Sequence, residues 1–144
     1  KDPLLRTMIW NDLWQMVRSL EMPLKDYVQV VEKHFAPETD LLLLEQIVRT
    51  ISGRGSERSS VLQYWPATPG NEKDRQNFIA TMERQYLNRF RSAKGGSDAQ
   101  KFWFDNYVAI GRSSEALKQM AKWFEQETVA KGFKLDLDRQ WGLV

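Results

Sequence analysis

Apolar residues recur every three or four positions along almost the whole chain, and no stretch alternates as a strand does. The first segment shows the pattern twice. One apolar face holds Leu5, Ile9, Leu13, Met16 and Leu20, and a second stripe beside it holds Trp10, Trp14 and Val17. A helix that is apolar over so wide an arc packs against neighbours on two sides. The spacing therefore predicts an all-α protein.

Prolines, glycines and capping residues divide this pattern into six or seven helices. Gly111 is expected in the left-handed conformation that closes a helix, and the stretch 56–65 fits either a separate helix or a bent continuation. The expected helix starts are Asp2-Pro3, Pro23, Glu38-Thr39-Asp40, Asn71, Ser97 with Gln100, Ser113 or Ser114, and Asp136 or Asp138.

Short connections between these helices favour antiparallel neighbours. Two architectures fit the pattern, a closed bundle or a row of helix pairs stacked as a HEAT/armadillo-like array. The wide apolar arcs favour the array, which we expect to form a single helical domain over residues 1–144. The chain begins at Lys1 and stops at Val144, shortly after the last helix begins, so we expect it to be a fragment of a larger domain.

Composition excludes several classes of function. The formal net charge is +2, from 21 basic and 19 acidic side chains, which is too small to attract nucleic acid or an anionic membrane by itself. The absence of cysteine rules out disulfides and thiolate metal sites. The longest apolar run, Leu41 to Leu44, is too short to span a bilayer.

Few side chains are candidates for chemistry, and we predict no catalytic, cofactor-binding or metal-binding residue. His34 is the single histidine, so a zinc site built from histidine and cysteine is not expected. Glu38 with Asp40, and Asp136 with Asp138, resemble acid/base pairs, but each pair lies where a helix begins, and capping explains it.

Other features have both an ordinary and a functional interpretation. A basic run is formed by Arg84, Arg89, Arg91 and Lys94. Its ordinary interpretation is a solvated helix end, and the functional one is a site for an anionic partner or a peptide carboxylate. Trp65 is either a core residue or an interface residue. Gly53-Arg54-Gly55 lacks the lysine and the spacing of a phosphate-binding loop, and Arg58 lies in the same stretch.

Several short strings, in order along the chain, resemble the helical C-terminal domain of the aminopeptidase N family of zinc metallopeptidases. They are Asp2-Pro3-Leu4-Leu5-Arg6 leading into Trp10, Leu13 and Trp14; Pro37-Glu38-Thr39-Asp40; Gly96-Ser97-Asp98-Ala99-Gln100; and Leu135-Asp136-Leu137-Asp138 with Trp141. The similarity is poorest over 52–76.

The resemblance implies an array of HEAT-like helix pairs that covers the catalytic domain of the same parent chain, encloses the substrate chamber and limits which peptides enter. The parent would use zinc to remove N-terminal amino acids from peptides. Its His-Glu-x-x-His and Gly-x-Met-Glu-Asn strings are absent here, so the resemblance assigns no catalytic residue to this chain. We expect no nucleic-acid or membrane partner and a cytoplasmic location. The alternative is a stand-alone helical-repeat module that binds another protein.

Overall fold

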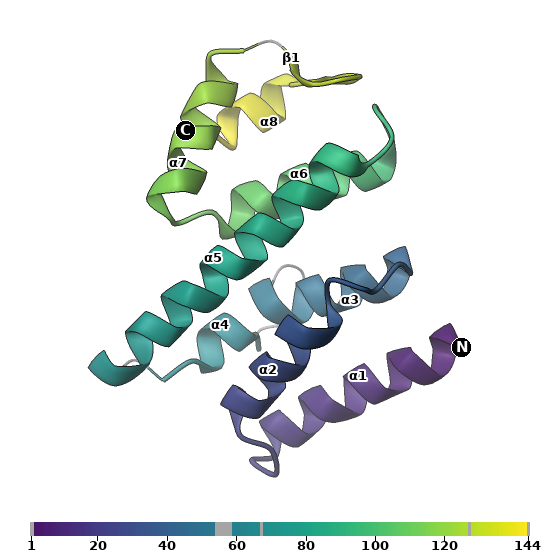
Figure 1. The fold of residues 1–144 in the computed structure, drawn as a ribbon, viewed down its shortest axis with the longest axis vertical. Coiled ribbons are helices and arrows are strands. Elements are labelled where there is room, and N and C mark those ends of the chain that lie inside the picture. The colour runs from purple at the N-terminus through teal and green to yellow at the C-terminus, as the bar shows by residue number, and fades with distance from the viewer. Residues whose placement is uncertain (1, 54–58, 67, 127, 144) are drawn as a thin grey trace. The chain divides into compact units, whose positions relative to one another are not determined.

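The computed structural model describes residues 2–53, 59–66, 68–126 and 128–143 (Figure 1). Within these ranges most of the chain is helical, which confirms the predicted all-α class. The helices are α1 (Pro3–Arg18), α2 (Leu24–His34), α3 (Leu41–Ser52), α4 (Val61–Tyr64), α5 (Pro69–Ser92), α6 (Asp98–Ile110), α7 (Ser114–Phe124) and α8 (Leu137–Trp141). Two short strands, β1 (Thr128–Ala130) and β2 (Phe133–Lys134), lie between α7 and α8.

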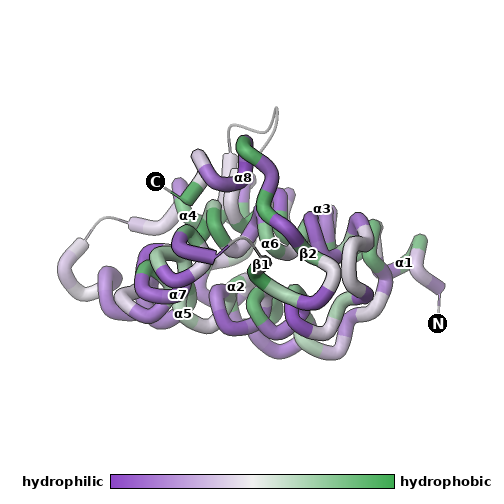
Figure 2. Tube along the Cα trace, turned by 90° about the horizontal axis from the view of Figure 1, so that it is seen from above, coloured by the Kyte–Doolittle hydropathy of each residue, from purple (hydrophilic) through white to green (hydrophobic). Residues whose placement is uncertain are grey.

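The chain divides into two compact units, Lys1–Arg75 and Gln76–Val144, with the boundary inside α5. In the first unit α1 packs against α2 and α3, and α4 packs against α3 and α2. The core of this unit is mostly aliphatic, and Figure 2 shows how hydrophobic and hydrophilic residues alternate along the helices. The fully buried side chains here include Val31, Phe35, Leu43, Ile47 and Ile51.

The core of the second unit is an aromatic cluster. Phe90 of α5, Phe104 of α6, Trp123 of α7 and Phe133 of β2 meet with ring centroids 4.9 to 5.7 Å apart. Each of these rings is at most 3% exposed. The cluster therefore joins three helices and the hairpin of this unit in one core.

Local sequence signals explain most helix boundaries. As predicted, Asp2, Asp40 and Ser97 each accept a backbone N–H in the first turn of the helix that follows. Of the alternatives left open by the sequence, Ser113 and Asp136 are the caps of α7 and α8. At α6 the predicted capping box takes a variant form, because the Gln100 side chain accepts the N–H of Gly96 at 2.7 Å. The undecided stretch before Trp65 contains a separate short helix, α4, capped by Ser60.

Three expectations about local structure are wrong. A two-stranded antiparallel hairpin occupies 128–134, and it is too short for strand periodicity to reveal. The α5 helix begins at Pro69 rather than at Asn71, since proline fits the first turn of a helix. Gly111 has a φ of −56°, so it is not left-handed. A side chain there would instead meet the Met120 methyl group at 2.7 Å, so what Gly111 provides is space.

The two apolar stripes of α1 also differ in their surroundings. Trp10, Trp14 and Val17 are buried, as the second stripe predicts. On the other stripe Leu5 is 56% exposed and Ile9 is 48% exposed. Within the first unit, α1 therefore uses only one of the two faces that the sequence marks as apolar.

Candidate functional site

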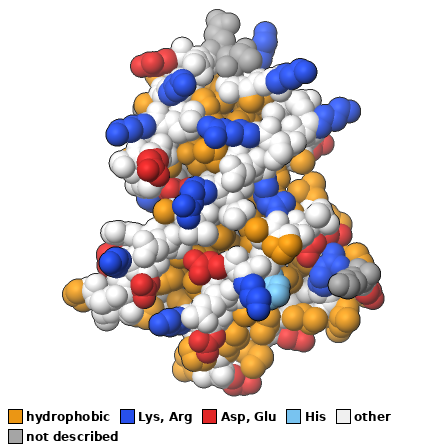
Figure 3. All heavy atoms as spheres, in the orientation of Figure 1, with side chains coloured by type: hydrophobic (Ala, Val, Ile, Leu, Met, Phe, Trp, Pro, Cys, Tyr) orange, Lys and Arg blue, Asp and Glu red, His pale blue; other side chains and the backbone are white. Residues whose placement is uncertain are grey.

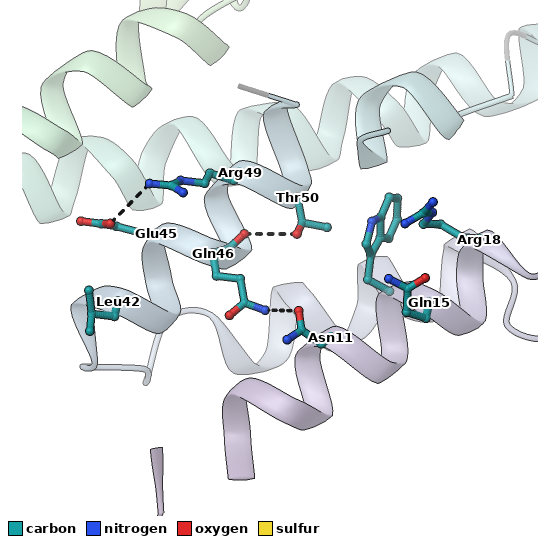
Figure 4. A pocket seen from close by; sticks show the side chains of 9 residues that line it. Asn11, Gln15, Arg18, Leu42, Glu45, Gln46, Arg49 and Thr50 are labelled. Atoms are coloured by element: carbon teal, nitrogen blue, oxygen red, sulfur yellow. Dashed lines mark hydrogen bonds and ion pairs between the residues drawn. The ribbon is translucent and has the colours of Figure 1, made fainter. Parts of the chain in front are cut away.

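A groove with a largely polar lining lies between α1 and α3 of the first unit (Figure 4). Its volume is about 410 Å³, within the range of ligand pockets. Residues one helical turn apart on each helix line it, so the two helix faces meet side by side. Asn11, Trp14, Gln15 and Arg18 come from α1, and Leu42, Glu45, Gln46, Arg49 and Thr50 come from α3.

Hydrogen bonds fix part of this lining. The Gln46 side-chain amide donates to the Asn11 side-chain oxygen and so bridges the two helices. The Thr50 hydroxyl donates to the Gln46 carbonyl at 3.1 Å, while Arg49 and Glu45 form a loose ion pair at 3.9 Å. Asn11, Gln46 and Thr50 are thus engaged in the packing of α1 on α3 or within α3.

Trp14 is only 5% exposed, yet its indole N–H is one of the buried polar groups without an acceptor among the described residues. Its ring packs against Tyr27 and Tyr64, with centroids 5.4 and 5.6 Å away. These contacts hold the ring in one place. Sequence analysis assigned Trp14 to the core, which is correct for the ring and leaves the N–H unexplained.

A second, more apolar hollow of about 480 Å³ lies between α1 and the end of α2. Its apolar lining includes Ile9, Trp10, Leu13 and Val30, and His34 also lines it. The side chain of His34 is exposed, and it appears at the surface as the pale-blue group in Figure 3. The other titratable groups lining this hollow are Arg6 and Glu38, which pair with each other.

The hydrogen bonds of Glu38 show that its side chain serves the fold. Its carboxylate accepts Arg6 Nε at 2.9 Å and the backbone N–H groups of Thr39 and Asp40, both at 2.9 Å. Burial works against the charged form, but these hydrogen bonds together outweigh it and lower the pKa of Glu38. Asp40 accepts the N–H of Leu43 and caps α3. The pair therefore stabilises a helix start and its junction with α1.

The second acidic pair is also structural. Asp136 caps α8, and the hydrogen bond from the Arg139 N–H, followed by the charge of Arg139, lowers its pKa. Arg139 also forms a two-pronged ion pair with Asp105 of α6, at 2.8 and 2.9 Å. Its guanidinium lies 5.8 Å from the centre of the Phe133 ring. These contacts attach α8 to α6 and to the hairpin.

The basic run at the end of α5 does not converge on one point. Arg84 contacts Thr81, Arg89 lies over the Trp103 ring at 5.1 Å, and Arg91 donates to Gln119. On the face shown in Figure 3, lysine and arginine side chains are scattered among neutral groups. These contacts do not favour a shared anion site, and Arg84 fits a solvated helix face, whereas Arg89 is half-buried against Trp103.

Trp65 is half-buried and donates its indole N–H to the Asn71 carbonyl at 3.1 Å, which ties the loop to the start of α5. Arg54, Gly55 and Arg58 lie outside the described residues. In the described ranges, no cluster of three histidine, cysteine, aspartate or glutamate side chains is arranged to hold a metal ion. Nor does any helix there have the length and apolarity needed to cross a bilayer.

Sequence analysis missed Arg18 and Gln15 as members of a groove. The available signal was residue spacing, because the groove residues lie one helical turn apart on each helix. They are Asn11, Trp14, Gln15 and Arg18 on α1, and Leu42, Glu45, Gln46 and Arg49 on α3. This signal could not be used, because the sequence does not show that these two faces lie side by side.

The described residues form two helical units with one short hairpin, and the acidic pairs at Glu38 and Asp136 serve caps and ion pairs. Residues 1–143 match the model of the ERAP1-like C-terminal domain, and the chain belongs to that family. This confirms the resemblance drawn from the sequence.

A curated relative, aminopeptidase N of Streptomyces lividans, is 23% identical over 143 residues. The aligned region covers 99% of this chain and 15% of the relative. The chain therefore corresponds to a small part of that protein.

Proposed function

We propose that this chain is a non-catalytic cap segment of a zinc aminopeptidase. In this role it would help to enclose the substrate chamber and limit which peptides reach the catalytic domain of the same parent chain. The parent would remove N-terminal amino acids from peptides. The observation that carries this proposal is the family match over residues 1–143, together with a relative named aminopeptidase N.

The contents of the described residues are consistent with a scaffold role. The acidic pairs at Glu38 and Asp136 serve caps and ion pairs, and His34 lies apart from any second histidine because it is the only one. These residues do not make up a zinc site, so the metal of the proposed parent would be held by residues outside this chain. We propose no nucleic-acid or membrane partner, and we expect a cytoplasmic location.

The test is to read the parent gene upstream of Lys1. A frame that encodes His-Glu-x-x-His and a downstream glutamate supports the cap function. The full-length protein should then release N-terminal residues from peptides and lose this activity with a zinc chelator, while the 144-residue chain alone should be inactive. Peptidase activity in the isolated chain would overturn the proposal.

A second candidate is a stand-alone helical-repeat module that binds another protein. The exposed apolar stripe of α1 favours it, because Leu5, Ile9 and Met16 are each at least 38% exposed on one side of the helix. A start codon just before Lys1 and a stop codon near Val144 would support the module and exclude the cap.

A further inference from the structure

The two ends of the α1–α3 groove differ in charge. In Figure 4 the Glu45–Arg49 pair lies at one end, and Arg18 and Gln15 lie together at the other. Arg18 forms neither a hydrogen bond nor an ion pair with any residue that the structure describes. The Arg18 end of the groove therefore offers an unneutralised guanidinium next to an amide.

Trp14, which helps to line the groove, carries a second unused donor. The indole N–H of Trp14 is buried, and no described residue accepts its hydrogen bond. A buried donor without an acceptor is unfavourable, and an acceptor from outside the chain would remove that cost. Tyr27 and Tyr64 pack against the ring, so the orientation of this donor is fixed by the fold.

The charges and lining of the groove limit the chemistry of that acceptor. Two guanidinium groups and one carboxylate line the groove, and Asp12 and Glu21 lie in the neighbouring hollow that shares Arg18, so the surroundings match a monoanion better than a doubly charged phosphate. Leu42, whose side chain is 78% exposed, supplies apolar surface. A volume of about 410 Å³ fits a small molecule.

We propose that the α1–α3 groove binds a small aliphatic carboxylate. The carboxylate would pair with Arg18 and accept the indole N–H of Trp14, and its aliphatic part would lie towards Leu42. This inference goes beyond the cap function and does not depend on it. Its basis is the meeting of an unpaired guanidinium and a buried, unsatisfied indole N–H in one groove.

Two acids are the natural competitors for Arg18. Asp12 and Glu21 line a neighbouring hollow that also includes Arg18, and Glu21 accepts the Ser19 hydroxyl at 2.8 Å. Neither acid forms an ion pair with Arg18 among the described residues. Removing the negative charge of Asp12, which lies on α1, by Asp12→Asn should therefore leave carboxylate binding unchanged or make it tighter.

The experiment follows the indole N–H signals of the 144-residue chain by NMR, with ¹⁵N-labelled tryptophan and Trp14→Phe for assignment. Butyrate is titrated at constant ionic strength, and butyramide, which has the same shape without the charge, is the matched ligand. We expect a saturable shift of the Trp14 signal with butyrate, none with butyramide, and a weaker response to phosphate. Arg18→Gln should weaken butyrate binding about tenfold.

Arg84→Gln is the control variant, since Arg84 belongs to the second unit and is not among the residues that line this groove. It should bind butyrate as the unaltered chain does, and circular dichroism checks that each variant is folded. Equal shifts with butyrate and butyramide, or unchanged affinity in a folded Arg18→Gln variant, would overturn the proposal. Because the readout is binding, its failure would leave the cap function untouched.

Discussion

The two units achieve their stability by different means. The first unit is built from aliphatic helix faces, and large apolar side chains such as Leu4, Leu5, Met8 and Ile9 remain about half or more exposed. The second unit gathers aromatic rings from three helices and a hairpin around Phe104, which is 1% exposed. The two units therefore differ in the make-up of their cores, while both leave apolar surface exposed, since Phe124 is 54% and Trp141 is 75% exposed in the second unit.

Buried polar groups show a further feature of the second unit. In the second unit Glu83 is 4% exposed and accepts the N–H groups of Arg112 and Ser113, at 2.6 and 3.0 Å. A charged acceptor at these N–H groups fixes the start of α7, where the helix dipole favours negative charge. Gln100 fixes the α5–α6 loop in the same way through Gly96. In the second unit, the buried side chains of Glu83 and Gln100 therefore fix the backbone of two loops.

The largest expected effect tests the core of the second unit. Phe104→Ala removes a ring that touches Phe90, Trp123 and Phe133, and it should lower the free energy of unfolding by about 3–5 kcal/mol. Ile9→Ala, on the exposed stripe of α1, should cost no more than about 0.5 kcal/mol. Chemical denaturation followed by circular dichroism measures both. Similar losses in the two variants would show that the stripe is as important internally as the aromatic core.

Sequence reasoning predicted the helices well because their signals are local. The caps at Asp2, Asp40, Ser97 and Ser113 depend on residues within one turn, so the sequence displays them directly. Glu83 gave no such signal, since its partners lie 29 and 30 positions away. Long-range contacts of this kind become visible only when the helices are placed.

The candidate groove shows the same limit. Each of its two helix faces can be read from residue spacing, but their meeting depends on how α1 packs against α3. The prediction that both stripes of α1 pack against neighbours was not met within the first unit, for a different reason. Periodicity correctly marks Leu5 and Ile9 as apolar, but it does not state whether a neighbour within the chain covers them.

A smaller effect tests how the hairpin closes the second unit. A Cβ at Gly95 would lie 2.5 Å from the Lys131 carbonyl oxygen, and this is backbone that cannot rotate away. Gly95→Ala should therefore cost about 1–3 kcal/mol. Gly70→Ala is the matched control, because a Cβ there meets nothing within 4 Å and alanine favours the helix. Thermal unfolding of both variants measures the difference. A Gly95→Ala variant as stable as Gly70→Ala would mean that the hairpin is only loosely attached.

The smallest expected effect concerns acid stability, and it compares one carboxylate from each unit. Folding lowers the pKa of Glu38 because hydrogen bonds from Asp40, Arg6 and Thr39 outweigh the effect of burial. A carboxyl with a lowered folded pKa stabilises the fold above its unfolded pKa, near 4.3, and this contribution is lost as the pH falls through the folded value. Glu38→Gln should thus cost about 1 kcal/mol at pH 7 and progressively less below pH 4.

Asp136→Asn is the counterpart in the second unit. Asparagine keeps the cap of α8 but loses the charge that pairs with Arg139. Because the Asp136 side chain is 54% exposed, water screens that charge, and the loss should be smaller than for Glu38→Gln. Melting temperatures measured from pH 7 to pH 3 compare the two variants. If Asp136→Asn shows the larger pH-dependent loss of melting temperature, then the attachment of α8 depends more on its surface charges than on the buried Phe133. The aromatic core alone would then not account for the stability of the second unit.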